Sequence, residues 1–127
     1  MAQIQSQLDP HSEVFARNRA AMLAAIEQVQ QLEQNLLNKA AEAKDKFSKR
    51  GQLLPRERLN LLLDPGAPFL ELASLAGYKL HDDKDGSSAG GGLIAGIGYV
   101  CGIRAMVVAN NSAIKGGTIS PSGLKKS

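Results

Sequence analysis

The C-terminal part of the chain holds the segment best suited to bind a ligand, Lys115-Gly116-Gly117-Thr118. Glycine has no Cβ, so backbone N–H groups there can approach a ligand closely, and the lysine adds a positive charge. Ser120 and Pro121 just after it are typical of a helix start, where anions are favoured. The segment therefore predicts a small phosphate- or carboxylate-binding turn. A tight turn that needs glycine at positive φ explains the same residues equally well.

Other kinds of catalytic site find little support in the sequence. Neither the Walker A spacing nor the dinucleotide-binding glycine pattern is present. Cys101 is expected to be a small buried residue and not a nucleophile, because both histidines, His11 and His81, lie in unrelated segments. The acidic loop 81–88 could hold a metal ion, but a flexible surface connection is favoured, since metal ligands must be held in fixed directions. We therefore assign no catalytic and no metal-binding residue.

Composition places the chain among small proteins with one modest core. It has 127 residues, of which 43% are hydrophobic and one is a cysteine, so an internal disulfide is excluded. No apolar run approaches the roughly 18–20 residues that span a bilayer. The net charge of +3 comes from local clusters without interleaved aromatic residues, so nucleic-acid binding is disfavoured. The N-terminus lacks a signal-peptide pattern, which favours a cytoplasmic bacterial protein.

A long helix is predicted from Asp9-Pro10 to about Lys49, because aspartate caps helices and proline suits the first turn. Gly51 is expected to end it. Its apolar positions form one stripe, so the helix is expected to lie along a larger body or another subunit, with a coiled-coil arm as the alternative. The stripe consists of Phe15, Met22, Ile26, Val29, Leu36 and Ala40.

A second, shorter helix is predicted over residues 54–63. Pro55 stands in its first turn, and Asp64-Pro65-Gly66 follows as a turn. The charged triplet Arg56-Glu57-Arg58 is expected to fix this helix to nearby loops, because surface charges are usually solvated or paired. A functional role for the triplet is the alternative.

The glycine-rich half is predicted to form β-structure. Residues 69–80 alternate as in a strand, and residues 93–100 and 103–109 are expected to form a hairpin around Cys101-Gly102. The last two strands are almost continuously apolar, which suggests a sheet covered on both faces. Two glycines inside the first of these strands suggest the close approach of another segment.

Several blocks after Lys49 follow one another in the order of a known protein family. The blocks are residues 51–59, 62–72, 76–78, 90–98, 106–110 and 115–118. They resemble the carboxyltransferase (β) subunits of biotin-dependent acyl-CoA carboxylases. Leu-Pro-Arg-Glu-Arg at 54–58 together with Lys-Gly-Gly-Thr is similar to the methylcrotonyl-CoA and geranyl-CoA carboxylase branch. Asn111 and the run 119–122 favour the geranyl-CoA enzyme, because the resemblance implies aspartate and aromatic residues there in methylcrotonyl enzymes.

The resemblance implies an α/β fold and a biotin-dependent carboxyl transfer. Residues 51–127 would start a crotonase-like (ClpP/crotonase) N-terminal carboxyltransferase domain, and residues 1–50 would be a helical extension. The subunit would move a carboxyl group from carboxybiotin, carried on a partner α subunit that uses ATP, to the γ carbon of a branched unsaturated acyl-CoA. Backbone oxyanion holes would stabilise the reacting oxygens, and the glycine-rich loops that form them are expected beyond Ser127. Another β subunit of a homo-oligomer would complete each site, so the chain alone is expected to be inactive.

The resemblance also implies where the acyl-CoA substrate binds. Lys115, Gly116, Gly117 and Thr118 are the candidates for lining the acyl-CoA site, and Lys125 and Lys126 are candidates for contacts to the CoA phosphates. Two alternatives stay open. The chain could belong to a decarboxylase subunit of the same fold in a sodium-pumping membrane complex. It could instead be a non-catalytic helix-plus-hairpin interaction module, although a final helix of about one turn would be too short to bury much.

Overall fold

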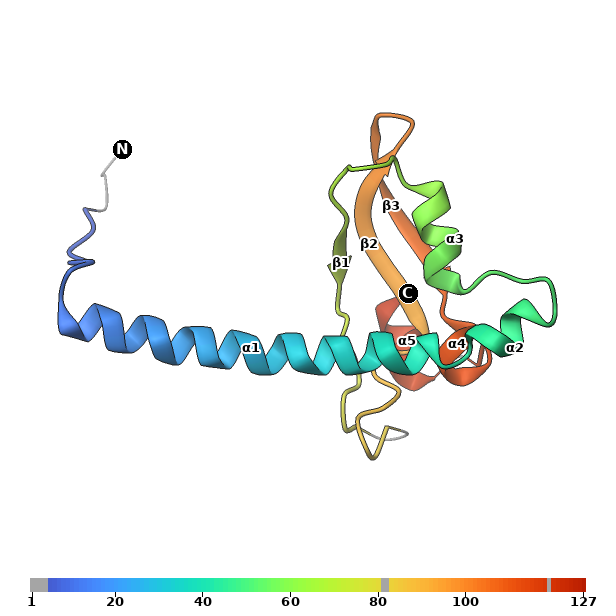
Figure 1. The fold of residues 1–127 in the computed structure, drawn as a ribbon, viewed down its shortest axis with the longest axis horizontal. Helices are drawn as coiled ribbons and strands as arrows, with labels where there is room; N and C mark the ends of the chain where they lie inside the picture. Colours follow the sequence, from blue (N-terminus) through green and yellow to red (C-terminus); the bar gives the residue numbers. More distant parts are fainter. Residues whose placement is uncertain (1–4, 81–82, 119) are drawn as a thin grey trace. The chain divides into compact units, whose positions relative to one another are not determined.

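The computed structural model describes residues 5–80, 83–118 and 120–127. Contacts divide the chain into two compact units, Met1–Leu32 and Glu33–Ser127, and each is described by itself. Helix α1 (Glu13–Ala41) runs through both units, and the other described helices and strands belong to the second (Figure 1). The division of the chain into 1–50 and 51–127 stays a prediction.

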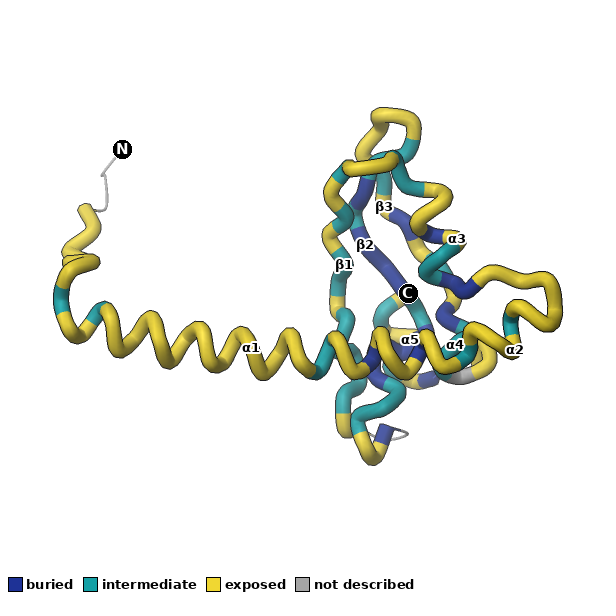
Figure 2. The backbone as a smooth tube through the Cα atoms, in the orientation of Figure 1, coloured by how far each residue is buried: buried dark blue, intermediate teal, exposed yellow. Residues whose placement is uncertain are grey.

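Helix α1 begins about one turn later than predicted. Ser12 is its N-cap, because the Ser12 hydroxyl accepts a hydrogen bond from the Phe15 N–H at 3.2 Å. Asp9 instead organises the turn before the helix, where its carboxylate accepts from the His11 N–H at 3.0 Å. Residues 16–31 are all exposed (Figure 2). Among the described residues, no helix combines the length and the apolar character needed to cross a membrane.

Helix α1 ends at Ala41, and a separate short helix, α2 (Lys44–Ser48), follows it. The Ala43 N–H bonds to the Ala40 carbonyl at 3.3 Å, which is the i→i−3 bond of a tightened last turn. The prediction of one continuous helix through this region is therefore wrong. The break contains neither glycine nor proline, so the sequence carries no local signal for it. Gly51, at a φ of 65°, ends α2 instead of α1.

Helix α3 (Pro55–Leu62) forms close to its predicted position, with proline at its first residue. The Glu57 carboxylate accepts a hydrogen bond from the Leu54 N–H at 2.9 Å, which satisfies one N–H group at the helix start. The helix ends where Leu63 becomes extended, and Gly66 in the following turn has a φ of 77°. The local signals for both ends of this helix are confirmed.

Three antiparallel strands form one sheet in the order β1 (Leu70–Leu72), β2 (Leu93–Val100) and β3 (Ile103–Asn110). The predicted hairpin is confirmed. Cys101 and Gly102 join β2 to β3 with φ values of 52° and 77°, as a two-residue turn with positive φ at both positions requires. Cys101 is exposed in this turn, so the prediction of a buried cysteine is wrong.

Strand β1 is much shorter than the predicted strand 69–80. Ala73 has a φ of 50°, in the left-handed region, which ends the extended backbone. The Ala73 carbonyl then accepts from the Ala76 N–H at 3.0 Å, and the Tyr78 N–H bonds to the Leu75 carbonyl at 3.0 Å. These bonds form consecutive turns. The prediction of a strand continuing to residue 80 is therefore wrong.

The core of the second unit forms where α3 packs on the sheet. It contains Leu59, Ile94 and Val107, with the partly buried Leu63, Phe69 and Val100 against them. The predicted close approach at a β2 glycine is confirmed, since a Cβ on Gly96 would lie 2.6 Å from the Leu70 carbonyl oxygen.

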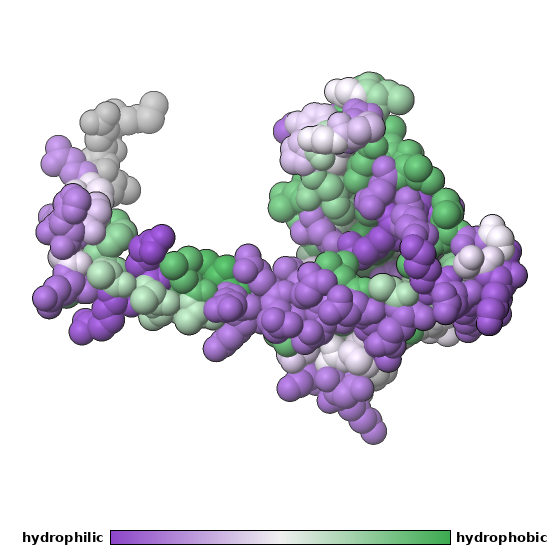
Figure 3. All heavy atoms as spheres, in the orientation of Figure 1, coloured by the Kyte–Doolittle hydropathy of each residue, from purple (hydrophilic) through white to green (hydrophobic). Residues whose placement is uncertain are grey.

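Strand β3 has an open apolar face among the described residues. Met106 and Val108, two positions apart on one face of the strand, are exposed there, and Figure 3 shows apolar side chains gathered on the surface of the second unit. The prediction of a sheet covered on both faces is wrong for the described chain, because nearly continuous apolar strands do not show what lies against each face.

Candidate functional site

A single-turn helix, α4 (Ser112–Lys115), follows β3 and leads into the predicted ligand-binding turn. Gly116 ends the helix with a φ of 62°, and Gly117 follows with a φ of 91°. A Cβ would meet nothing within 4 Å at Gly116, and at Gly117 it would lie 3.8 Å from the Ser112 Cβ. The backbone conformation, and not crowding, therefore requires glycine here. Both glycines and Thr118 are exposed, whereas the Lys115 side chain lies outside the described part of the structure.

Helix α5 (Pro121–Lys126) starts as predicted, with Ser120 as its N-cap. The Ser120 hydroxyl accepts from the Gly123 N–H at 3.0 Å. The first turn packs against the glycine run 90–92, where a Cβ on Gly91 would lie 2.7 Å from the Gly123 Cα. Ser120 and Gly123 are both buried. This helix start therefore faces the protein, and the case for anion binding depends on the exposed turn 115–118.

The two lysines of α5 have different surroundings. The Lys126 ammonium donates to the carbonyl oxygens of Leu93 at 2.7 Å and Gly90 at 3.2 Å, which ties the end of α5 to the glycine run. Burial lowers the pKa of Lys126, and the nearby Glu71 carboxylate partly offsets this. Lys125 is exposed, and both lysines border a hollow of about 250 Å³. Lys125 is therefore accessible, while Lys126 has an anchoring role in the fold.

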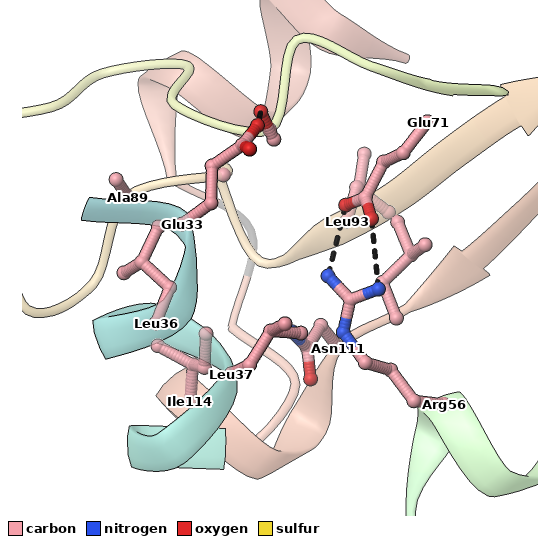
Figure 4. A pocket seen from close by; sticks show the side chains of 12 residues that line it. Glu33, Leu36, Leu37, Arg56, Glu71, Ala89, Leu93, Asn111 and Ile114 are labelled. Atoms are coloured by element: carbon pink, nitrogen blue, oxygen red, sulfur yellow. Dashed lines mark hydrogen bonds and ion pairs between the residues drawn. The ribbon is translucent and has the colours of Figure 1, made fainter. Parts of the chain in front are cut away.

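A cavity of about 300 Å³ is bordered by residues of α1, α3, the sheet and α4 (Figure 4). Arg56 donates to both carboxylate oxygens of Glu71, at 2.7 and 2.9 Å, and Ser74 donates to Glu33 at 2.6 Å. Asn111 is only 6% exposed, and its Oδ1, like the Nε of Arg56, has no hydrogen-bond partner in the described structure. The cavity has the room and the polar groups that a bound water molecule needs.

The charged triplet of α3 is mainly structural, as favoured from the sequence. Arg56 ties α3 to β1 through the Glu71 carboxylate. The Leu54 N–H, which donates to Glu57, lowers the pKa of that carboxyl, and Lys44 at 3.4 Å contributes in the same direction. The structural interpretation is confirmed for these two members. Arg58, the third member, is exposed.

The acidic loop before the glycine run is organised around one buried carboxylate. Asp83 is 2% exposed and accepts from the Lys79 N–H at 3.1 Å. It also accepts from the N–H and the hydroxyl of Ser88, each at 2.8 Å. The prediction of a surface connection is therefore wrong at Asp83, whose hydrogen bonds shape the loop. His81 and Asp82 lie outside the described residues, and the rest of the described chain shows no cluster of three or more metal-binding side chains.

Comparison with known proteins connects these elements to one family. The sequence model of the carboxyl transferase domain matches residues 46–127. The mitochondrial methylcrotonoyl-CoA carboxylase beta chain of Arabidopsis thaliana is 40% identical over 94% of this chain, which covers 20% of that protein. The biotin-dependent 3-methylcrotonyl-coenzyme A carboxylase beta1 subunit of Mycobacterium tuberculosis is 50% identical over 66% of the chain, covering 15% of that subunit.

Two solved structures share the fold. The crystal structure of the Pseudomonas aeruginosa geranyl-CoA carboxylase beta subunit is 71% identical, with a TM-score of 0.85, over 97% of this chain and 23% of that one. The transcarboxylase 12S structure is 23% identical, with a TM-score of 0.69, over 83% of this chain and 21% of that one, and this likeness concerns the fold alone.

The chain spans about a fifth of the length of the curated relatives it matches. The family match nevertheless covers most of it, from the end of α2 through the sheet, the exposed turn and α5. The helices and antiparallel strands agree with the α/β class expected from the sequence. The chain therefore belongs to the carboxyl transferase domain family, as its residues predict, and carries part of a crotonase-like carboxyltransferase domain.

Proposed function

We propose that this chain is part of a carboxyltransferase β subunit that moves a carboxyl group from carboxybiotin to the γ carbon of a branched unsaturated acyl-CoA. Geranyl-CoA is the favoured substrate, and 3-methylcrotonyl-CoA is the next candidate. The observation that carries the proposal is the 71% identity to the P. aeruginosa geranyl-CoA carboxylase beta subunit over 97% of the chain. The methylcrotonyl-CoA carboxylase relatives named above are 40% and 50% identical.

The proposal includes partners for the chain. Biotin would be carried by an α subunit, where ATP is used, and would supply the carboxyl group. No described residue of this chain is assigned to hold biotin. Other β subunits would form a homo-oligomer with it, and the assembly would lie in the cytoplasm of a bacterium. This chain's own share of the work is then to help bind and orient the acyl-CoA.

The proposed acyl-CoA contacts lie on the turn 115–118. The exposed backbone at Gly116 and Gly117 leaves room for a ligand to approach. Lys115 and Thr118 belong to the same proposed site, and Lys125 is the accessible lysine for a CoA phosphate. Lys126 would act on the site indirectly, because its ammonium donates to two backbone carbonyls.

The experiment that tests this function uses the full-length β subunit with its biotin-bearing partner. Incorporation of labelled bicarbonate is measured with ATP and either geranyl-CoA or 3-methylcrotonyl-CoA. We expect a higher kcat/KM for geranyl-CoA. Sodium-dependent decarboxylation without carboxylation would favour a decarboxylase subunit, and the absence of both activities would favour a non-catalytic module.

A single substitution tests the proposed site. Lys115→Ala should raise the KM for acyl-CoA and leave kcat nearly unchanged, because a charge that contacts the phosphates binds the substrate and transition state equally. An unchanged KM would exclude this lysine from the acyl-CoA site. Lys84→Ala, which removes a lysine from the acidic loop, is the matched control.

A further inference from the structure

We propose that Arg58 and the hollow beside it form an anion-binding subsite that takes a phosphate group of the acyl-CoA. This inference deepens the function proposed above and rests on it. The hollow has a volume of about 620 Å³ and lies between α3 and β3, reaching the exposed turn at Gly117. A cation of α3 and Gly117, one of the two glycines proposed to contact the substrate, therefore line the same hollow.

Arg58 differs in its pairing from the other arginine of α3. Both terminal nitrogens of the Arg56 guanidinium donate hydrogen bonds to the Glu71 carboxylate. Residues two positions apart do not face the same side of a helix, so Arg58 projects elsewhere. It is exposed, and the described contacts include no hydrogen bond or ion pair of its side chain. Its guanidinium is therefore available to a ligand.

The lining of the hollow favours an anion over a cation. Arg58 is the only charged residue among its described lining residues, and no carboxylate opposes it. Asn110 and Ser112 add polar groups to the lining, which also includes Gly117. A second hollow of about 420 Å³ shares Arg58 and Ser112, and its described lining also contains no acidic residue. An uncompensated guanidinium beside neutral hydrogen-bonding groups suits an anionic ligand.

Phosphate is the anion that this geometry fits best. A guanidinium presents parallel N–H donors that match two oxygens of a phosphate, and these charge-assisted bonds are stronger than neutral ones. The lining also contains the apolar residues Leu59, Leu62 and Val107, so a ligand with both charged and apolar parts would be complementary. An acyl-CoA has this character, with phosphates on a long thioester-bearing arm.

The test compares three variants of the full-length subunit assembled with its biotin partner. For Arg58→Gln we expect the KM for acyl-CoA to rise by about tenfold or more with kcat nearly unchanged, as expected for losing a charged hydrogen bond in the ground and transition states alike. Arg58→Lys should recover part of the loss, because the charge remains without the two-pronged geometry. Arg104→Gln, which removes an exposed arginine from β3, is the matched control and should behave as wild type.

A substrate lacking the 3′-phosphate identifies which phosphate is bound. If Arg58 binds the 3′-phosphate, Arg58→Gln should cause no further loss with the dephospho-CoA thioester. If it binds the pyrophosphate, the loss should persist with that substrate. A KM for Arg58→Gln within twofold of wild type would overturn the subsite.

Direct binding of CoA to the subunit separates this inference from the proposed function. If the wild-type complex carboxylates neither acyl-CoA, the proposed function fails, and the CoA affinities of wild type and Arg58→Gln then decide the subsite alone. Weaker binding by Arg58→Gln would support it, and equal affinity would overturn it. The assembly state and circular dichroism of each variant verify that the fold is retained.

Discussion

The ion pair between Arg56 and Glu71 should be a main tie between α3 and the sheet, and Glu71→Gln tests this. The pair joins residues 15 positions apart through two short bonds of 2.7 and 2.9 Å. The side chains are only 32% and 23% exposed, so water replaces the lost contacts incompletely. Glutamine keeps one acceptor oxygen but removes the charge, which leaves the guanidinium partly buried without a counter-ion.

The expected cost follows from these contacts. A hydrogen bond to a charged group contributes about 1.5–3 kcal/mol, and breaking a fully buried ion pair costs about 3–5 kcal/mol. The pair is partly exposed and glutamine keeps one acceptor oxygen. We therefore expect Glu71→Gln to cost about 2 kcal/mol of stability, within the range for one hydrogen bond to a charged group. Such a loss corresponds to about 30-fold more frequent local opening.

Hydrogen exchange measured by mass spectrometry reports this opening directly. We expect faster exchange in peptides that contain β1 and the start of α3, because the pair connects these two elements. Glu42→Gln is the control, since Glu42 pairs with Lys39 on the helix surface with side chains 66% and 52% exposed. Such surface pairs contribute about 0–1 kcal/mol. If both variants exchange alike, the Arg56–Glu71 pair contributes no more than a surface pair and the reasoning is refuted.

Two further predictions concern the glycine run and acid stability. Gly91→Ala should destabilise the protein by about 1–3 kcal/mol, seen as a lower melting temperature, because its new Cβ would press on the Gly123 backbone 2.7 Å away. Gly51→Ala has equally positive φ but open space, so a loss of equal size would show that conformation alone matters. Glu57 has a lowered pKa, so its stabilising effect is complete above its ordinary pKa of 4.5 and is lost as the pH falls through the lower folded-state pKa. Glu57→Gln should remove that part of the acid dependence of α3 exchange, and an unchanged acid profile would contradict it.

The elements that the sequence predicts well have signals within a few residues of where they act. Pro55 and Glu57 mark the start of α3, Ser120 marks the start of α5, and Cys101-Gly102 forms the hairpin turn. Each of these residues either starts or caps a helix or forms a tight turn in the adjacent backbone. The neighbouring residues are therefore enough to predict the element. The candidate turn 115–118 was visible for the same reason.

The features that escaped prediction depend on residues distant in the chain or on backbone angles without a glycine signal. Lys126 bonds to carbonyls 33 and 36 positions earlier, so nothing beside it distinguishes it from Lys125. Ala73 adopts a left-handed φ that its residue type does not favour. The end of β1 could therefore not be predicted from the sequence. Asp83 lies among charged residues typical of a surface loop, yet it is buried and accepts a hydrogen bond from the Ser88 N–H, five positions further along the chain.

The triplet Arg56-Glu57-Arg58 shows why neighbouring charges cannot be assigned one shared role. Successive residues of a helix point about 100° apart around its axis, so each member of the triplet faces different surroundings. One arginine pairs with the sheet, the glutamate caps its own helix, and the other arginine borders the hollow next to Gly117. The role of each charged residue therefore depends on the direction in which its side chain points. A motif written as consecutive residues does not specify that direction. When only one of two arginines on a helix pairs with a carboxylate of the protein, the arginine without such a pair is the better candidate for binding an anionic ligand.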